Sequence, residues 1–441
     1  MSTTTDFKAI IVGGGLSGLL AAISLRSAGF DFILLEQRDH IVVNEGASIG
    51  LNAATFRILY QLGLLEACRK AGHPLSRKCT FFLDGHVWDS ALFDLMVESH
   101  GFPMILYDRV DLIRVLYDAL YKDHHKLLTS KKLDTITTDD TGVTVTCNDG
   151  SKYSGSIVIG ADGVHSKTRQ AMRKLALAAN VDKEIWEAEK PFPALYRSVY
   201  FSFPRTTPQG VMAETHSEGK SIFYVTGTDH ASVFLCENLP EPTTERSNYT
   251  EDDKKAIIKR FWDFPIIESL TVGDVAEQEY IASGMIDLEE GVAKKASYER
   301  IVIIGDAYHK VTPHCGLGFN MGAQDIAVLV NLLKDAVDTS KTGEPTTEAL
   351  NTAFQTYQTS RDKNVSKDMV VGNLLVRMSM WMNWSLWLLG RYVFTTKLWE
   401  WLFLKRLLSD GIKCGYVLNH IPGEEPFVGK IPWDNRIPAQ L

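Results

Sequence analysis

The residues whose types and spacing best indicate chemistry are three glycines near the N-terminus, Gly13, Gly15 and Gly18. They follow the apolar run 9–12, which is too short for a typical helix and is typical of a buried parallel strand. In a dinucleotide-binding turn, the first glycine makes the tight turn, the second admits a pyrophosphate, and the third lets helix and strand pack closely. The helix predicted over 16–28 would offer its N-terminal N–H groups to the phosphates.

A carboxylate completes this pattern. Glu36 lies 18 residues after Gly18, at the end of a second apolar strand predicted over 32–35. A carboxylate there accepts hydrogen bonds from a ribose diol and disfavours a 2′-phosphate, so the unit is predicted to bind FAD or NAD rather than NADP. The strand–helix–strand context favours a nucleotide site with a right-handed crossover. A glycine-rich turn without a nucleotide is the alternative.

Two further predicted strands also end at a glycine and an aspartate. The run 156–159 leads into Gly160–Gly163, which contains Asp162, and the run 301–304 leads into Gly305 and Asp306. A glycine-rich loop, 313–320, follows the second motif and precedes a helix, predicted over 322–335. Such loops allow a ligand to approach the backbone closely, and the helix N-terminus can stabilise negative charge. Each motif taken singly is a common turn.

The elements that must position these motifs follow from periodicity. Residues 51–72 and 108–122 are predicted to be helical, and 134–160 to form strands. Residues 190–285 contain alternating apolar and polar stretches separated by Pro- and Gly-containing loops, which is typical of an antiparallel sheet that could cover a ligand. The pattern therefore predicts an α/β protein with a second, mainly antiparallel sheet.

Composition excludes several classes of protein. Of the 441 residues, 45% are hydrophobic and 23% charged, which is typical of a globular chain and not of a disordered or collagen-like one. The 46 Lys and Arg against 54 Asp and Glu give a net charge of −8, so nucleic acid is not an expected partner. The six cysteines show no CxxC spacing, so we expect no metal site and an intracellular, reduced protein. Residues 1–8 do not resemble a secretory signal.

The C-terminal region 371–408 is rich in tryptophan and leucine. It contains five of the nine tryptophans, flanked by basic residues. Its longest stretch without a charge, 378–390, is shorter than the roughly 20 residues that span a bilayer. A helical element packed on the main body is one interpretation, and peripheral association with a membrane interface is the other.

The three motifs, in this order and spacing, resemble those of the class A FAD-dependent monooxygenases, the para-hydroxybenzoate hydroxylase-like group. The resemblance covers about residues 7–365. Within the group, Gly46–Leu51, Asp108–Leu112 and His309–Pro313 resemble the fungal FAD-dependent monooxygenases of secondary metabolism, which include epoxidases of meroterpenoid and indole-diterpene pathways. A hydrophobic C-terminal extension is common there, which favours the membrane interpretation.

The resemblance implies roles for individual residues. Beyond the three glycines of the first motif, Glu36 would bind the adenosine ribose, Gly50 and Arg109 would contact FAD between its adenosine and its flavin, and Asp162 would support the pyrophosphate and the handling of NAD(P)H. Asp306 would hold the ribityl chain. Gly318 and Phe319 would contact the isoalloxazine through their backbone, although the family usually has a small residue at the position of Phe319.

The catalytic residue is less well defined. The fungal group often has a proposed catalytic tyrosine in the region that corresponds to about 213–224, where this sequence offers His216 and Tyr224. Arg197, on a predicted strand, is a third candidate. Each of them also has a structural interpretation. His309 lies before, and His314 within, the glycine-rich loop 313–320, which we call the flavin loop, and either could donate a proton or simply hold the loop.

The fold implied is a Rossmann-like FAD-binding domain with an inserted, mainly antiparallel β substrate domain and a helical C-terminal extension. The expected boundaries are 1–180 and 296–365 for the FAD-binding domain, 181–295 for the substrate domain and 366–441 for the extension.

The function implied is an FAD-dependent monooxygenase that consumes NADPH or NADH and inserts one oxygen atom from O2, by epoxidation or hydroxylation, into a hydrophobic secondary metabolite. The expected substrate is a prenylated polyketide or meroterpenoid, or an indole terpenoid. A phenol or salicylate-type hydroxylase is a second hypothesis, and a non-catalytic flavin-binding protein is a third. The expected location is cytoplasmic or on a membrane, including the endoplasmic reticulum.

Overall fold

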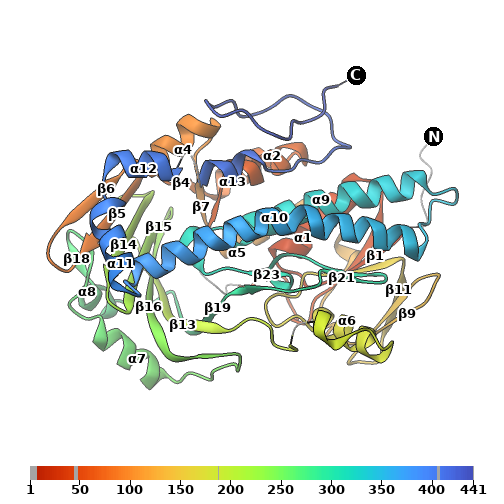
Figure 1. Cartoon of the computed structure of the whole chain (residues 1–441), viewed down its shortest axis with the longest axis horizontal. Coiled ribbons are helices and arrows are strands. Elements are labelled where there is room, and N and C mark those ends of the chain that lie inside the picture. Colours follow the sequence, from red (N-terminus) through yellow and green to blue (C-terminus); the bar gives the residue numbers. More distant parts are fainter. Residues whose placement is uncertain (1–6, 44–47, 187, 405–407, 441) are drawn as a thin grey trace.

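Two large sheets organise the chain in the computed structural model, which describes residues 7–43, 48–186, 188–404 and 408–440 (Figure 1). The first has six strands in the order β21-β22-β12-β1-β2-β8. Its strands are β1 (Lys8–Val12), β2 (Asp31–Leu35), β8 (Leu127–Leu128), β12 (Ile157–Gly160), β21 (Ser297–Tyr298) and β22 (Ile301–Ile303). All pairs except β21 with β22 are parallel. The strand ends after β1, β2, β12 and β22 therefore meet at one edge.

The N-terminal unit agrees with the predicted strand–helix–strand pattern. Helix α1 (Leu16–Ser27) connects β1 to β2, and Ala9–Val12 are buried because both faces of this sheet are covered. Helices α1 and α9 (Gly318–Thr339) pack together, and α9 packs on α10 (Thr347–Ser379). The core of this part is one continuous cluster that includes the apolar residues of these elements.

The second sheet has seven strands in the order β19-β13-β16-β15-β14-β5-β6. Its strands are β5 (Arg77–Phe82), β6 (Val87–Ser90), β13 (Ala194–Pro204), β14 (Val211–Ser217), β15 (Lys220–Thr226), β16 (His230–Thr243) and β19 (Ala282–Glu289). It is mainly antiparallel, as predicted, but β5 pairs with β14 in parallel. Residues 77–90 thus complete this sheet although they lie within the predicted range 1–180 of the FAD-binding domain.

Smaller elements surround the two sheets. A three-stranded sheet contains β9 (Leu133–Thr138), β10 (Val143–Cys147) and β11 (Lys152–Gly155), and another contains β3 (Ser48–Leu51), β4 (His73–Pro74) and β7 (Ile105–Asp108). Two-stranded pairs are formed by β17 (Pro265–Ile267) with β18 (Leu270–Thr271), and by β20 (Gly291–Val292) with β23 (His309–Lys310). The remaining helices before residue 300 are α2 (Ala53–Gln61), α3 (Leu65–Ala71), α4 (Leu92–His100), α5 (Arg109–Ala119), α6 (Lys167–Ala178), α7 (Glu251–Arg260) and α8 (Val272–Ala276).

The C-terminal region begins inside a helix. The predicted boundary between residues 365 and 366 falls within the 33-residue helix α10, which continues without a break to Ser379. Beyond it lie α11 (Trp384–Leu388), the π-helical turn Leu389–Val393, α12 (Lys397–Phe403) and α13 (Ser409–Lys413). Residues 414–440 have no helix or strand and cover α2, where Arg57 and Glu425 form an ion pair at 2.6 Å. No helix in the described ranges is long and apolar enough to cross a membrane.

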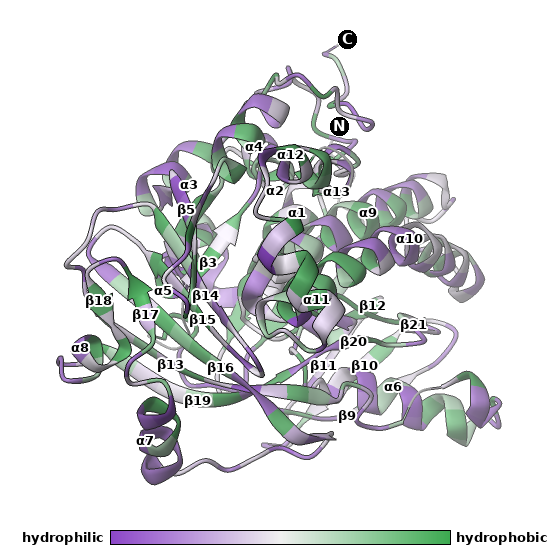
Figure 2. Cartoon of the chain, turned by 60° about the vertical axis from the view of Figure 1, so that its left-hand side comes forward, coloured by the Kyte–Doolittle hydropathy of each residue, from purple (hydrophilic) through white to green (hydrophobic). Residues whose placement is uncertain are grey.

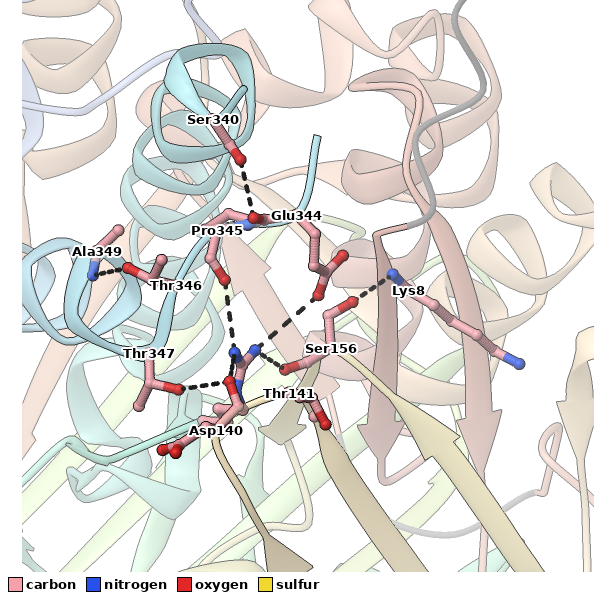
Figure 3. Close-up of polar contacts among 12 residues, drawn as sticks. Lys8, Asp140, Thr141, Ser156, Ser340, Glu344, Pro345, Thr346, Thr347 and Ala349 are labelled. Atoms are coloured by element: carbon pink, nitrogen blue, oxygen red, sulfur yellow. Dashed lines mark hydrogen bonds and ion pairs between the residues drawn. The ribbon is translucent and has the colours of Figure 1, made fainter. Parts of the chain in front are cut away.

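A buried arginine connects three distant segments of the first domain. The Arg300 guanidinium donates to the carbonyl oxygens of Ser156 at 3.0 Å and Asp140 at 2.7 Å, and it also reaches that of Pro345. Figure 3 shows the acceptors Asp140, Ser156 and Pro345 close together, beside the loop that precedes α10. Together with Glu344, whose carboxylate lies 3.9 Å from Nη1, these carbonyl groups compensate a charge that is 1% exposed, while Nε has no partner among the described residues.

Candidate functional site

The first glycine motif forms a tight loop between β1 and α1. Gly13 has φ +109°, and a side chain on it would lie 2.5 Å from the carbonyl oxygen of Ala161. A Cβ on Gly18 would lie only 1.9 Å from the carbonyl oxygen of Gly13, so helix and loop pack as closely as the motif predicts. Gly15 is the N-cap of α1 and supplies no side-chain cap. The N-terminal N–H groups of this helix are therefore not occupied by a capping side chain and suit an anionic group.

Glu36 lies at the end of β2, directly beside this loop. Its carboxylate accepts hydrogen bonds from the backbone N–H groups of Gly14 at 2.6 Å and Arg38 at 2.9 Å, and the residue is buried. Two backbone donors hold the carboxylate in a fixed orientation at the edge of the sheet. This is the position that the sequence predicts for an acceptor of ribose hydroxyl groups.

Two further predicted contacts come from the β3–β7 sheet. Arg109 is the first residue of α5, and its Nη2 lies 3.8 Å from where a Cβ of Gly15 would be. The guanidinium thus adds a positive charge near the N-terminus of α1. Gly50 packs on Met104, whose Cε lies 2.4 Å from where a Cβ of Gly50 would be, so a side chain there would require the Met104 side chain to move. Gly46 and Ala47 of the same motif lie outside the described residues.

Asp162 has its own partners within the turn after β12. Its Oδ1 accepts from the hydroxyl of Ser166 at 2.5 Å, and its Oδ2 accepts from the backbone N–H of Thr168 at 2.9 Å. The carboxylate therefore orders the start of α6 and the turn whose backbone contacts Gly13. Within the described structure it supports the dinucleotide loop through this turn.

The third motif brings Asp306 to the N-terminus of α9. Asp306 forms an ion pair with Lys310 at 2.5 Å, and its Oδ1 lies 3.9 Å from where a Cβ of Gly318 would be. Gly318 is the first residue of α9, and Phe319 follows it with a buried side chain in the main core. Ser17 Oγ approaches Gly305, at 2.7 Å from the Cβ position. The N-termini of α1 and α9 therefore converge on the same space.

A buried asparagine holds the flavin loop against the β3 segment. Asn320 donates from Nδ2 to the carbonyl oxygens of Gly50 at 2.8 Å and Gly316 at 2.6 Å. Its Oδ1 accepts from the N–H of Asn52 and the hydroxyl of Thr55. The sequence places Asn320 in the motif but gives it no role. A polar residue in the first turn of an otherwise apolar helix is the signal that could have identified it.

A charged network under the same loop was not predicted. Asp325 is fully buried on α9 and accepts from Arg361 Nε at 2.7 Å and from the Gly305 N–H at 2.8 Å. His309 Nε2 lies 2.7 Å from the same carboxylate. Burial raises the pKa of Asp325, but His309 and Arg361 outweigh it and hold the pKa below its usual value. The network fixes the loop that contains Asp306.

A cavity lies between the flavin loop, the second sheet and the C-terminal helices. The flavin-loop side contributes Asn52, Met104, His314, Gly316, Leu317 and Asn320. The sheet contributes Lys78, Thr80, Trp88, Ser90, Met212, Glu214 and His216. The C-terminal region closes it with Leu375, Met378, Gly390, Phe394, Thr395, Glu400, Phe403, Leu404, Leu408 and Ile412, and α4 adds Leu92, Phe93 and Met96. Most of the lining is apolar, so the cavity suits a hydrophobic ligand.

A small polar cluster interrupts this apolar lining. Glu214 lies 3.1 Å from Lys78 Nζ and 3.0 Å from His216 Nε2. Burial raises the pKa of Glu214, but the charges of Lys78 and His216 outweigh it and hold the pKa far below its usual value. His314 Nε2 lies 3.4 Å from Ser221 Oγ, and burial lowers the pKa of this histidine to about 4. Nδ1 of both buried histidines has no hydrogen-bond partner among the described residues.

The other two catalytic candidates lie outside the cavity lining. Tyr224 is fully buried in the core on the opposite face of the sheet, where its hydroxyl bonds Thr207 Oγ1 at 2.6 Å. Arg197 on β13 pairs with Glu237 at 2.5 Å. The structure thus brings His216 to the cavity, but not Arg197 or Tyr224.

The loops at the strand ends fit FAD. Two uncapped helix N-termini converge, a buried carboxylate stands at the ribose position, and Gly13 and Gly18 permit the close backbone packing that a dinucleotide-binding turn requires. The adjoining apolar cavity would accommodate a substrate beside the flavin. Fold and site together define a flavoprotein with a dinucleotide-binding α/β domain.

Comparison with known proteins gives the family. A family model described as FAD binding domain matches residues 6–367. The FAD-dependent monooxygenase olcE of Penicillium canescens is 32% identical, over 88% of this chain and 84% of the relative. The FAD-dependent monooxygenase srdH of Neurospora crassa is 32% identical over 98% of this chain and 99% of the relative. The chain belongs to this family of fungal FAD-dependent monooxygenases and is an oxidoreductase.

Solved structures agree on the fold. Klebsiella pneumoniae HpxO, complexed with FAD and uric acid, superposes with a TM-score of 0.67 at 20% identity, over 93% of this chain and 96% of that chain. Native FqzB superposes with a TM-score of 0.68 at 17% identity, over 95% and 97% of the two chains. At these identities the likeness shows the mixed α/β fold with its FAD-binding domain.

Proposed function

We propose that this enzyme uses NADPH or NADH and O2 to insert one oxygen atom into a hydrophobic, prenylated secondary metabolite, by epoxidation or hydroxylation. The observation that carries the proposal is the cavity, which begins at the flavin loop and is lined mostly by apolar side chains from three other segments. Bound FAD would supply the reductive activation of O2 and the transfer of one oxygen atom.

The cofactor-binding residues keep the roles that the sequence predicts. The N-termini of α1 and α9, with Arg109, would bind the pyrophosphate and the negative charge of the reduced ring. Glu36 would accept hydrogen bonds from the ribose hydroxyl groups. Asp306 would accept a hydrogen bond from a hydroxyl group of the ribityl chain. The backbone at Gly318 and Phe319 would contact the isoalloxazine ring.

The C-terminal helices would exclude water from the reaction. Phe394 and Phe403 pack edge to face with ring centroids 5.3 Å apart, and both line the cavity. Leu404 is buried beside them. An apolar roof keeps water away from a reactive oxygen donor, which would otherwise be lost without transfer to the substrate.

His216 would exchange a proton with the substrate. Because Nε2–H donates to Glu214, neutral Nδ1 is an acceptor that can take a proton from a hydroxyl group, and the protonated ring can donate from Nδ1. Glu214 fixes the orientation of the His216 ring through this hydrogen bond. Lys78 neutralises Glu214 at 3.1 Å, so the polar end of the cavity carries a compensated charge.

The ion pair between Lys78 and Glu214 disfavours the alternative of a salicylate-type hydroxylase. A small aromatic acid requires a cation for its carboxylate, and the lysine that lines the cavity already faces Glu214. A prenyl chain requires the apolar walls that the cavity provides. A non-catalytic flavin-binding protein would show no NADPH oxidation with any substrate.

The first experiment is the visible spectrum of the purified protein, followed by NADPH addition in air with a panel of prenylated phenols and soluble aromatic acids. We expect flavin bands, NADPH oxidation stimulated by a prenylated compound, and a product heavier by one oxygen atom. A colourless protein that cannot be reconstituted with FAD would contradict the proposal, and stimulation by aromatic acids alone would favour the alternative.

His216→Gln tests the proton exchange, with Tyr224→Phe and Arg197→Gln as matched controls on the same sheet. We expect His216→Gln to lower product formation by about 10²-fold, the lower end of general acid–base contributions. The pH dependence of kcat should also change in this variant. If a control variant keeps its FAD and its melting temperature but loses activity, the substituted residue has a catalytic role that the cavity lining does not indicate.

A further inference from the structure

A small side chamber adjoins the substrate cavity. Its volume is about 30 Å³, and five residues line both spaces: Asn52, Leu317, Asn320, Leu408 and Ile412. The residues that line the chamber but not the cavity come from α2, α9, α10 and α13: Ala54, Met321, Gln324, Asp368, Val371 and Gly411. Figure 2 shows these four helices next to one another in the upper part of the view. The chamber therefore lies beside the flavin loop, under the C-terminal segment.

Asp368 on α10 contributes the one carboxylate among the described residues that line this chamber. The side chain is half-buried, and no described residue forms a hydrogen bond or an ion pair with it. Its Oδ1 lies 3.1 Å from where a Cβ of Gly411 would be, so the carboxylate is directly below α13. A carboxylate in such surroundings needs a hydrogen-bond donor.

Two amide groups of the chamber wall have an occupied oxygen and a free nitrogen. Gln324 Oε1 accepts from the Tyr416 N–H, and Asn52 Oδ1 accepts from the Thr55 N–H at 3.2 Å. These contacts fix both amides, because only the oxygen can accept from an N–H group. Gln324 is only 9% exposed, and its Nε2 has no partner among the described residues. The chamber thus offers two amide donors and one carboxylate acceptor.

This set of groups suits a bound water molecule. A water can accept from Gln324 Nε2 and Asn52 Nδ2 and donate to Asp368, which gives it a number of partners within the range of about two to four that buried waters have. A volume of about 30 Å³ accommodates one or two such molecules. A water held by these hydrogen bonds is not free to enter the cavity.

The reaction of a monooxygenase consumes a proton. One turnover converts the substrate, NADPH, O2 and one proton into the oxygenated product, NADP⁺ and one water molecule. The cavity walls are mostly apolar and exclude bulk water, so they provide no path for that proton. The polar chamber beside the flavin loop does provide one. Asp368 follows the exposed residues Ser366 and Lys367 on α10, so bulk solvent begins next to it.

We propose that the side chamber is a proton inlet, in which Asp368 passes protons from the solvent through a bound water to the cavity. The O–H bond of the protonated Asp368 breaks as its proton moves to the water, and the water releases one of its own protons to the cavity. The carboxylate then takes up a new proton from solvent, and no electron is transferred. The proposal rests on the proposed function only in placing the reaction inside the cavity.

The charges around Asp368 suit this exchange. Burial raises the pKa of Asp368 to about 6, and nearby cations limit the rise. The titratable groups that act on it or lie against it belong to α10, to the network under the flavin loop and to the end of α13: Arg361, Lys367, His309, Asp325 and Cys414. Arg361 and His309 both contact Asp325, so neither pairs with Asp368. A carboxyl group with this pKa both takes up and releases protons near neutral pH.

A pH profile of the full-length, FAD-loaded enzyme tests the inlet, with the prenylated phenol that stimulates NADPH oxidation as substrate. We expect kcat to fall as the pH rises above about 6, because Asp368 loses its proton. Asp368→Asn should lower kcat by at least about tenfold and remove this pH dependence, whereas Asp368→Glu should keep both. Formate should restore activity to Asp368→Ala, because it supplies the missing carboxyl group. Asp410→Asn, which removes an exposed carboxylate of α13, is the matched control and should behave like the wild type.

A second measurement needs no substrate. Infrared spectra of the holoenzyme should contain a carboxylic acid C=O band that disappears as the pH rises through about 6, and that Asp368→Asn lacks. Absence of this band, an unchanged pH profile in Asp368→Asn, or a failure of formate to restore Asp368→Ala would overturn the proposal. If the wild type oxidises NADPH with no compound of the panel, the proposed function fails, and the infrared band still decides whether Asp368 carries the proton.

Discussion

The FAD loops and the substrate cavity are built in different ways. The loops consist of backbone turns at neighbouring strand ends, and the contacts that shape them join glycines to backbone atoms, as at Gly13, Ala161 and Gly18. The cavity consists of side chains from segments that are distant in sequence, including β5, β14, the flavin loop and the C-terminal helices. The difference shows how the cavity lining can change while the cofactor site is preserved.

The two regions also differ in electrostatics. Under the flavin loop, Asp325 lies in a fully buried network with Arg361 and His309. In the cavity, Lys78 and Glu214 are partly accessible, and two buried histidines each keep one nitrogen without a partner. The first arrangement neutralises a fully buried carboxylate with two basic side chains, and the second places an ion pair at the wall of the cavity; His309 Nδ1 also has no partner among the described residues.

The largest expected effect on cofactor binding is at the glycine loop. Gly18→Ala would place a Cβ 1.9 Å from the carbonyl oxygen of Gly13, so α1 must move away from the loop. We expect FAD occupancy to fall by at least about tenfold, equivalent to about 1.4 kcal/mol of binding. The flavin-to-protein absorbance ratio measures it. Gly227→Ala, at a glycine with no neighbour closer than 3.6 Å, is the control, and equal occupancy in the two variants would contradict the backbone account.

The largest expected effect on stability is at the buried network. Asp325→Asn leaves Arg361 without its charged partner, and breaking a buried ion pair in this way destabilises proteins by about 3–5 kcal/mol. Denaturant unfolding of the holoenzyme measures the change. Asp338→Asn, which removes an exposed pair with Lys334, is expected to change stability by less than about 1 kcal/mol. Similar values for both variants would show that the network is not structural.

Acid should destabilise the fold first through histidines. Burial lowers the pKa of His314 and of His100 to about 4, whereas unfolding restores about 6.5. The unfolded state therefore binds more protons between pH 6.5 and 4, and stability falls as pH falls through this window and is flat above it. For each group the limit is about 3 kcal/mol. Melting temperatures across this range should fall less steeply in His314→Gln, and an unchanged slope would contradict the neutral buried ring.

The smallest expected effect is in the cavity roof. Phe403→Ala removes an aromatic ring from the wall next to Phe394 without touching the FAD loops. We expect normal FAD occupancy but a two- to tenfold lower yield of oxygenated product per NADPH consumed, because water enters the cavity. Peroxide release measures the loss. A fall in FAD occupancy instead would show that the cavity wall also supports cofactor binding, which contradicts the separation of the two regions.

The sequence by itself determined the family, the cofactor and the dinucleotide loops. Gly13–Gly18, Glu36 and Asp306 lie at or near strand ends, and each motif is local, so a few adjacent residues specify its conformation. The mainly antiparallel second sheet was also predictable, because its strands alternate in polarity. The assignments of individual FAD-contacting residues stay predictions until a holoenzyme is tested.

Only the tertiary structure decided what lines the cavity. Pairing of β5 with β14 brings Lys78 and Thr80 beside Met212 and Glu214, although residues 83–210 separate the two strands in the chain. Successive side chains of a strand point to opposite faces, so the register that pairs Tyr224 with Ala213 buries Tyr224 in the core and leaves His216 in the cavity. The two-residue turn Glu218–Gly219 sets that register locally. Which face of the sheet becomes the cavity follows from long-range packing of strands and C-terminal helices around a shared apolar space.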